Sequence, residues 1–313
     1  MKILYVISGN KKEISPIFSN QLESLKPFLT STKVFQVKGN GLFGYLKNIK
    51  PLRKAILEFN PDLVHAHYSF CGIIASVAGS RKTVVSLMGS DVKQGGIFKY
   101  LVRFFQKYFW NVTIVKSEEM KRTIRSRDIH VVPNGVNVDL FKPLNVKECR
   151  EKLSWKSEGI HILFAAKADN PIKNYPLFKK SVELLQHEVP EMIVHSLHDI
   201  PNDEMPLYYN AADVICLASK WEGSPNVIKE AMACNRPILS TNVGDVMWLC
   251  GTERGHFVTE SDPRKMASEL KKAIIFSKEE LQTNGRDRLS ELGLDSHTVA
   301  KKISSIYQTV IDT

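Results

Sequence analysis

Short apolar runs alternate with amphipathic stretches along the chain. Runs of four to eight apolar residues predict buried strands, and apolar positions spaced three and four residues apart predict helices. Alternation of the two is typical of βαβ units built around parallel sheets, so the pattern predicts an α/β fold. In the first half we expect strands near 2–8, 33–37, 62–66, 83–87, 111–115 and 129–132, and helices near 17–29, 51–59, 70–79, 97–109 and 117–126.

Residues 133–146 interrupt this pattern, because they carry Pro133, Gly135 and Pro143 and few periodic apolar positions;. We place a domain boundary here, between a first domain of residues 1–145 and a second of residues 146–294. The second domain is expected to hold strands near 161–166, 192–197, 214–217 and 237–240, helices near 175–188 and 203–210, a helix after residue 224, and two helices over 263–292. A last segment, about 295–311, also has helical spacing.

Length and composition suit an ordinary globular protein. The chain has 313 residues, of which 43% are hydrophobic and 24% are charged, enough for two domains;. No segment approaches the ~20 apolar residues of a membrane-spanning helix. The apolar run at residues 1–8 is too short for the core of a signal peptide, so we expect a strand there. Five widely spaced cysteines favour reduced thiols in the cytosol over disulfides or a metal site;.

Positive charge is concentrated in the first half of the chain. Residues 1–145 contain 22 Lys/Arg and 9 Asp/Glu, a net charge of +13, whereas residues 146–313 contain 21 and 24, a net charge of −3. The first half is therefore expected to attract an anionic partner. Two basic groups lie beside aromatic residues: Lys99, Arg103 and Lys107 on the helix expected at 97–109, and Lys47, Lys50, Arg53 and Lys54 near Phe43 and Tyr45.

Basic stripes beside aromatic side chains suit the surface of an anionic membrane. An ordinary helix with buried aromatics and a solvated basic face explains the same pattern equally well. Nucleic acid is not favoured, because no recognised binding motif accompanies the charge.

Residues 220–234 (KWEGSPNVIKEAMAC) combine acids with the start of a helix. Ser224 is expected to cap that helix, and Pro225 suits its first position, where the missing N–H would have no partner. The free N–H groups of such a helix start attract anions. Asn226 and Glu230 are four residues apart and would share one helix face. The segment suits a ligand with phosphates at one end and hydroxyls at the other.

The spacing of Glu222 and Glu230 resembles the E-x7-E signature of family 4 of the retaining glycosyltransferases. Collinear segments resemble the family as well: residues 133–136 with Phe141 and Pro143, residues 210–214, and residues 237–241 with Gly244. The resemblance implies the GT-B fold, in which two Rossmann-like domains face a cleft. It also implies that the last helix crosses back to the first domain.

The resemblance further implies a nucleotide-sugar site in the second domain. Lys167 and Lys173 stand where the family places an arginine and a lysine that offset the charge of the leaving diphosphate. The lysine at 167 keeps the charge but not the bidentate geometry of arginine, and both glycines of that family segment are missing;. The implied catalytic residues are Glu222, Lys167 and Lys173, and no metal is implied.

By the same resemblance, Glu230 would accept hydrogen bonds from the ribose hydroxyls, and Glu222 would lie near the transferred sugar. The chain between Lys173 and Glu222 is short and lacks the family's G-x-G-P segment, so we expect the loop around residue 198 to meet the base. The expected donor-binding residues are Gly223, Ser224, Pro225, Asn226, Val227, Glu230, Leu197 and His198.

In the first domain, residues 88–91 resemble a loop that the family often writes HGSD, with methionine in place of the histidine. Two histidines follow an expected strand end, where α/β proteins bind ligands, although a histidine bonded to the backbone is equally plausible for each. A serine before the first helix is a weaker candidate. The candidates on the acceptor or sugar side are His65, His67, Met88, Gly89, Asp91 and Ser15.

Together these features predict a retaining, metal-independent glycosyltransferase that uses a nucleotide-diphosphate sugar and no other cofactor. The acceptor would be a glycan or a lipid-linked molecule in cell-surface polysaccharide synthesis, and the enzyme would be cytoplasmic and peripheral on the inner membrane face. Two alternatives stay open: a nucleotide-sugar epimerase of the same fold, and a non-catalytic relative that binds nucleotides.

Overall fold

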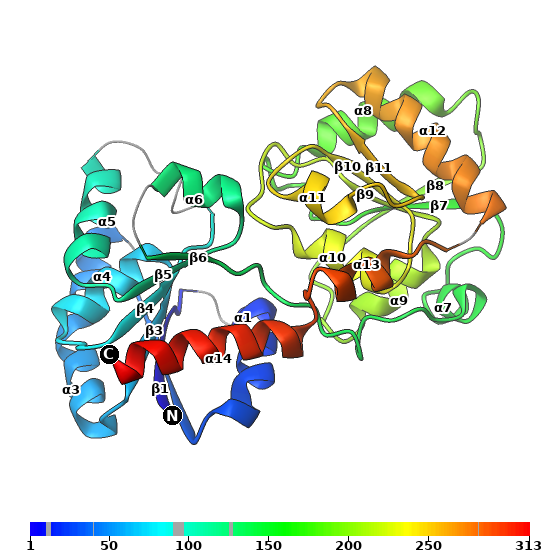
Figure 1. Cartoon of the computed structure of the whole chain (residues 1–313). Helices are drawn as coiled ribbons and strands as arrows, with labels where there is room; N and C mark the ends of the chain where they lie inside the picture. Colours follow the sequence, from blue (N-terminus) through cyan, green and yellow to red (C-terminus); the bar gives the residue numbers. More distant parts are fainter. Residues whose placement is uncertain (11–13, 40, 90–96, 125–127, 281) are drawn as a thin grey trace. The chain divides into compact units, whose positions relative to one another are not determined.

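A computed structural model describes residues 1–10, 14–39, 41–89, 97–124, 128–280 and 282–313, without the side chains of residues 42 and 97–99. The chain forms two compact units. Unit 1 comprises Met1–Gly135 and Ser296–Thr313, and unit 2 comprises Val136–Asp295. Each unit is a parallel sheet with helices on both faces (Figure 1), which confirms the α/β prediction.

The sheet of unit 1 has the order β2-β1-β3-β4-β5-β6, and all of its neighbouring strands are parallel. The strands are β1 (Lys2–Ser8), β2 (Ser31–Val37), β3 (Leu63–His67), β4 (Thr83–Ser86), β5 (Val112–Val115) and β6 (Ile129–Val131). The chain passes from β1 to β2 on one side and then from β3 onward on the other. The order of strands therefore reverses between β1 and β3.

Successive residues of β1 supply the two cores of this unit, because side chains alternate across a sheet. Leu4 and Val6 face α3 (Ile49–Phe59), α4 (Ser69–Val77) and α5 (Ile97–Tyr108), which lie side by side in Figure 1. Ile3 and Tyr5 face α1 (Pro16–Leu25) and α14 (Ser296–Asp312). The remaining helices are η1 (Lys26–Phe28), α2 (Gly41–Leu46) and α6 (Glu118–Ile124).

The last helix, α14, is part of unit 1. It packs against α1 and β3, and Val299, Ile303 and Tyr307 lie in the same core as Tyr5. Its Tyr307 is fully buried and its hydroxyl lies 2.6 Å from Nδ1 of His65 on β3. The helix thus completes a core that begins with the first strand of the chain.

The sheet of unit 2 has the order β11-β10-β9-β7-β8 and is also parallel. Its strands are β7 (Ile160–Phe164), β8 (Met192–Ser196), β9 (Val214–Leu217), β10 (Ile238–Thr241) and β11 (His256–Thr259). One face packs on α8 (Tyr175–Leu185) and α12 (Pro263–Glu279). The other packs on α9 (Met205–Ala211), α10 (Asn226–Ala233), α11 (Val246–Cys250) and α13 (Gly285–Glu291), and α7 (Val146–Lys152) packs on α9.

All five cysteines are buried, and none of them forms a disulfide. Among the described residues, no helix combines the length and the apolar character that crossing a bilayer requires.

Candidate active site

The strand order of unit 2 reverses between β7 and β9, and open α/β sheets bind ligands beyond the carboxyl ends of strands at such a point;. The loop after β7 carries Lys167 and Lys173. The loop after β9 carries Glu222. The topology therefore brings the expected catalytic residues to one edge of the sheet.

Lys173 and Glu222 form an ion pair at this edge, with 2.6 Å between Nζ and Oε1. Ser219 donates a hydrogen bond of 2.7 Å to the same Oε1. The backbone also joins the two loops, because the N–H of Lys220 donates to the carbonyl of Ile172 at 2.9 Å. The Lys173 and Glu222 side chains are 24% and 17% exposed, so the pair is held firmly and still borders solvent.

Lys167 lies in the same loop but is about half exposed and pairs with Asp199, which follows β8. The hydrogen bond to Asp199 raises the pKa of Lys167, and the same bond lowers the pKa of the Asp199 carboxyl. In this loop after β8, Leu197 is packed in the core, whereas His198 is exposed and bonds Ser196 Oγ at 3.0 Å. His198 is thus the better placed of the two to contact a base.

Helix α10 starts one residue later than the sequence predicts. Pro225 is its N-cap residue, with the extended angles φ −71° and ψ 119°, and Asn226 is the first helical residue. The prediction that Ser224 caps this helix is therefore wrong. Its hydroxyl oxygen is buried and lies close to the carboxyl group of Asp245.

Glu230 lies one turn into α10 and accepts a hydrogen bond of 2.7 Å from the hydroxyl of Tyr209 on α9. Burial raises the pKa of the Glu230 carboxyl, while the Tyr209 bond and the charge of Lys229 lower it. Tyr209 is fully buried, so the surrounding core fixes its position. Its hydroxyl group in turn fixes the orientation of the Glu230 carboxylate. A carboxylate held in this way is preorganised to accept hydrogen bonds from hydroxyls.

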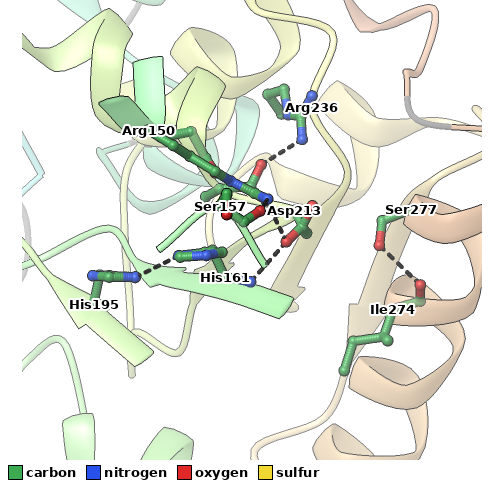
Figure 2. Close-up of polar contacts among 10 residues, drawn as sticks. Arg150, Ser157, His161, His195, Asp213, Arg236, Ile274 and Ser277 are labelled. Carbon is green, nitrogen blue, oxygen red and sulfur yellow. Dashed lines mark hydrogen bonds and ion pairs between the residues drawn. The ribbon is translucent and has the colours of Figure 1, made fainter. Parts of the chain in front are cut away.

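The segment 210–214 has a structural role, and Figure 2 shows the contacts of its Asp213. Asp213 accepts hydrogen bonds from the backbone N–H of His161 at 2.7 Å and from Nη2 of Arg150 at 2.8 Å, which joins β7, β9 and α7. Asn210 accepts from the N–H of Leu144 and donates to the carbonyl of Lys142. These bonds anchor the chain that enters unit 2 and fix the strands that carry the site.

In unit 1, the corresponding reversal lies between β1 and β3, and His65 and His67 belong to β3. His65 is fully buried between the Tyr307 hydroxyl and Ser86 Oγ, at 2.6 and 2.9 Å, so both of its nitrogens serve the core. His67 is 5% exposed, and neither ring nitrogen has a partner among the described residues. Burial, and then the charge of Lys116, lower the pKa of His67 to about 3.

The other candidates of unit 1 are less informative. Met88 is half-buried, and Gly89 is buried with φ of 98°, a conformation that glycine adopts freely;. Ser15 is exposed and does not cap α1 with its side chain. Asp91 lies outside the described residues.

Comparisons with known proteins agree with this architecture. The family model described as "Glycosyltransferase Family 4" matches residues 22–140, and that described as "Glycosyl transferases group 1" matches residues 173–275. The capsular polysaccharide biosynthesis glycosyltransferase CapM of Staphylococcus aureus is 30% identical, and the alignment covers 98% of this chain and 90% of CapM. The chain belongs to glycosyltransferase family 4.

Two further relatives of this family 4 glycosyltransferase span most of its length. The putative teichuronic acid biosynthesis glycosyltransferase TuaC of Bacillus subtilis is 26% identical over 86% of this chain and 78% of TuaC. An Escherichia coli enzyme named UDP-Gal:alpha-D-GlcNAc-diphosphoundecaprenol alpha-1,3-galactosyltransferase is 22% identical over 80% of this chain and 74% of its own.

Solved structures show that the fold is GT-B. Sucrose-phosphate synthase from Thermosynechococcus elongatus superposes with a TM-score of 0.80 at 15% identity, covering 100% of both chains. HepE of Anabaena, solved with UDP and glucose, gives a TM-score of 0.77 at 16% identity, covering 98% of this chain and 99% of its own. The predicted fold class is confirmed.

Two buried ionisable residues of the family 4 enzyme were not among the expected site residues. Lys229 on α10 is 0% exposed, and Asp245, between β10 and α11, is 9% exposed. Periodicity gave no sign of this, because a lysine beside an apolar stripe normally reads as solvated.

Proposed function

We propose that this enzyme transfers a sugar from a nucleoside diphosphate sugar, with retention of configuration and without a metal ion, to a glycan or lipid-linked acceptor. The observation that carries the proposal is the Lys173–Glu222 pair at the reversal point of the unit 2 sheet, with Glu230 on the helix that begins beside it. Two relatives support the setting, since CapM and TuaC are named for capsule and teichuronic acid biosynthesis. The named acceptor of the Escherichia coli relative is a lipid diphosphate, which supports a similar class here.

Charge explains how such a site would act. Negative charge develops on the diphosphate as the glycosidic bond breaks, and preorganised positive groups aimed at that charge usually supply the largest part of catalysis. Lys173 is fixed by Glu222, and Lys167 is tethered to Asp199 on the neighbouring loop. Two lysines would then do what a divalent metal does elsewhere.

The proposal predicts that one of UDP, GDP and ADP binds with the same affinity in excess chelator and in magnesium. Isothermal calorimetry on the wild-type protein measures this directly. The matching nucleotide sugar can then be incubated with a membrane extract, and the anomeric configuration of the product read by NMR. Absence of binding by all three nucleotides would contradict the proposal. Inversion at the anomeric carbon would overturn retention alone.

We also propose that unit 1 binds an anionic membrane surface through α5. Its outward face presents Tyr100, Phe104 and Tyr108, which are 70%, 49% and 61% exposed, together with the cation Lys107. The sequences of α2, α4 and α5 contain no acidic residue. Aromatic rings settle at the level of lipid headgroups, and each nearby cation adds about 1 kcal/mol on anionic lipids.

Replacing Phe104 and Tyr108 together by serine should weaken binding to vesicles of phosphatidylglycerol and phosphatidylcholine by at least ~10-fold, since two rings lose their apolar contact. Cosedimentation measures the effect, and high salt should weaken the wild-type protein as well. Trp248→Ser serves as a control, because Trp248 is a similarly exposed aromatic residue of unit 2. Equal sedimentation of all variants would rule out α5 as the docking surface.

A further inference from the structure

Asp245 and Lys229 place opposite charges inside unit 2, next to the loop that follows β9. Lys229 is 0% and Asp245 is 9% exposed, and their charges act on each other. Burial lowers the pKa of Lys229 to about 8, and Asp245 and Glu230 oppose that shift. A buried charge is costly unless an opposite charge lies near it, so each of the two residues lowers the cost of burying the other.

The pair lies directly against the candidate site. Gly244 packs so closely on the loop that a Cβ there would come within 2.6 Å of the Gly223 carbonyl oxygen and 2.9 Å of that of Glu222. Its φ of +58° also suits glycine;. Asp245 is the next residue in the chain, and both Ser224 and Glu222 shift the pKa of its carboxyl group. The segment 244–245 is therefore a second wall of the site.

Several polar atoms on these two segments lack hydrogen bonds to the described residues. They are both carboxylate oxygens of Asp245, Oγ of Ser224 and Oδ1 of Asn226, all of them buried. Asp245 is the N-cap residue of α11, yet its side chain does not cap that helix. Ser224 and the Asp245 backbone lie close enough to lower the pKa of this carboxyl, and its remaining lone pairs could accept a hydrogen bond from a bound hydroxyl group.

We propose that Asp245 accepts a hydrogen bond from a hydroxyl of the transferred sugar, with Ser224 and Asn226 contributing further polar atoms and Lys229 as the positioning residue. This inference rests on the proposed function, and it extends it from the nucleotide to the sugar. An ionised carboxylate only accepts hydrogen bonds, so Asp245 would favour sugars with a free hydroxyl at the facing position. A deoxy or O-acylated sugar would leave the carboxylate unpaired.

The ionisation of Asp245 depends on its neighbours. Burial raises the pKa of the Asp245 carboxyl to about 6, Lys229 and Ser224 oppose that shift, and Glu222 adds to it. Cys250 on α11 also faces it, and Glu230 lies beside Lys229 on α10. The ionised form is the one that accepts a hydroxyl. The sugar contact should therefore be present above pH 6 and be lost as the pH falls through that value.

The test compares Kd for a nucleotide with Kd for its sugar conjugate, using whichever of UDP and UDP-glucose, GDP and GDP-mannose, or ADP and ADP-glucose the wild-type protein binds. Asp245→Asn should leave the nucleotide Kd within about twofold and weaken the nucleotide sugar by at least ~10-fold, as for one lost hydrogen bond to a charged group. Asp287→Asn is the matched control, because Asp287 is an exposed carboxylate of the same unit.

The pH dependence supplies a second measurement that needs no Asp245 variant. For the wild-type protein, the Kd of the nucleotide sugar should rise relative to the Kd of the nucleotide below pH 6. For Lys229→Met the change should occur at higher pH, because the cation that favours the ionised carboxylate is gone. A purely structural Lys229 would not move this midpoint.

The outcomes separate the two proposals. If no nucleotide binds, the donor site is elsewhere and the proposed function fails together with this inference. If nucleotides bind but neither Asp245→Asn nor pH changes the ratio of the two Kd values, this inference alone is overturned. A parallel loss for nucleotide and nucleotide sugar would also overturn it, since the sugar would then have no contact of its own.

Discussion

Lys173→Ala should lower kcat by about 100- to 1000-fold, the loss typical of one preorganised group that stabilises developing negative charge. The lysine is suited to this part, because Glu222 and the hydrogen bond between Lys220 and Ile172 fix its loop at the reversal point of the sheet. Its charge would act mainly as the diphosphate departs. The effect should therefore appear in kcat more than in KM.

The measurement is transfer of a labelled sugar from the nucleotide sugar identified by calorimetry, with the unfolding temperature recorded for each variant. Lys179→Ala is the control, because Lys179 is an exposed lysine on the nearby α8. Lys173→Arg keeps the charge and should retain more activity than alanine. A kcat for Lys173→Ala within threefold of wild type would show that Lys173 serves only to neutralise Glu222.

Glu230→Ala should weaken nucleotide binding by at least ~10-fold, equivalent to about 1.4 kcal/mol. The carboxylate is oriented by the Tyr209 hydroxyl at 2.7 Å, so its geometry is set before a ligand arrives. Two vicinal ribose hydroxyls would donate to it, and alanine removes both bonds. The buried Tyr209 hydroxyl would also lose its acceptor, which adds a cost in stability.

Calorimetry in chelator with the nucleotide that binds best measures this effect. Glu279→Ala provides a matched control, as Glu279 is an exposed glutamate on α12 of the same unit. Comparison of the nucleoside diphosphate with the bare nucleoside tests the assignment further, because a ribose contact should be lost from both to the same extent. An unchanged Kd would remove Glu230 from the donor site.

Much of the fold could be predicted because the central strands of a parallel sheet are buried on both faces. The run at residues 214–217 is apolar throughout, and the structure has a strand there;. The missed elements are α2, α7, α11 and β11, of four to seven residues each. Helix α7, for example, buries only Cys149, so it has no apolar stripe to detect.

The sequence motifs could predict which residues belong to the candidate site, but not the contacts between them. The resemblance named Lys173 and Glu222, whereas their contact across 49 residues depends on the sheet order. The donor to Glu230, Tyr209, lies on a different helix, and no local pattern points to it. Ser224 shows the opposite failure. Its sequence position suits a cap, but the extended ψ of Pro225 moves the helix start beyond its reach.

The two histidines of β3 also differ in a way that the sequence could not predict. They are two residues apart in the sequence and were equivalent candidates, but Tyr307 and Ser86 occupy both nitrogens of His65. The tyrosine comes from the far end of the chain, which no local motif can reveal. His67 keeps both nitrogens available within the described structure and stays the candidate of unit 1.

The placement of α14 in unit 1 has a consequence for the order of folding during synthesis. Unit 2 is one continuous stretch, Val136–Asp295, and can bury both of its cores as soon as it has been made. Unit 1 is translated first, but the face of β1 with Ile3 and Tyr5 is covered only in part, by α1, until Ile303 and Tyr307 arrive. An apolar face left open this long is a target for aggregation. Nascent unit 1 should therefore depend on chaperones that shield it, while unit 2 matures first.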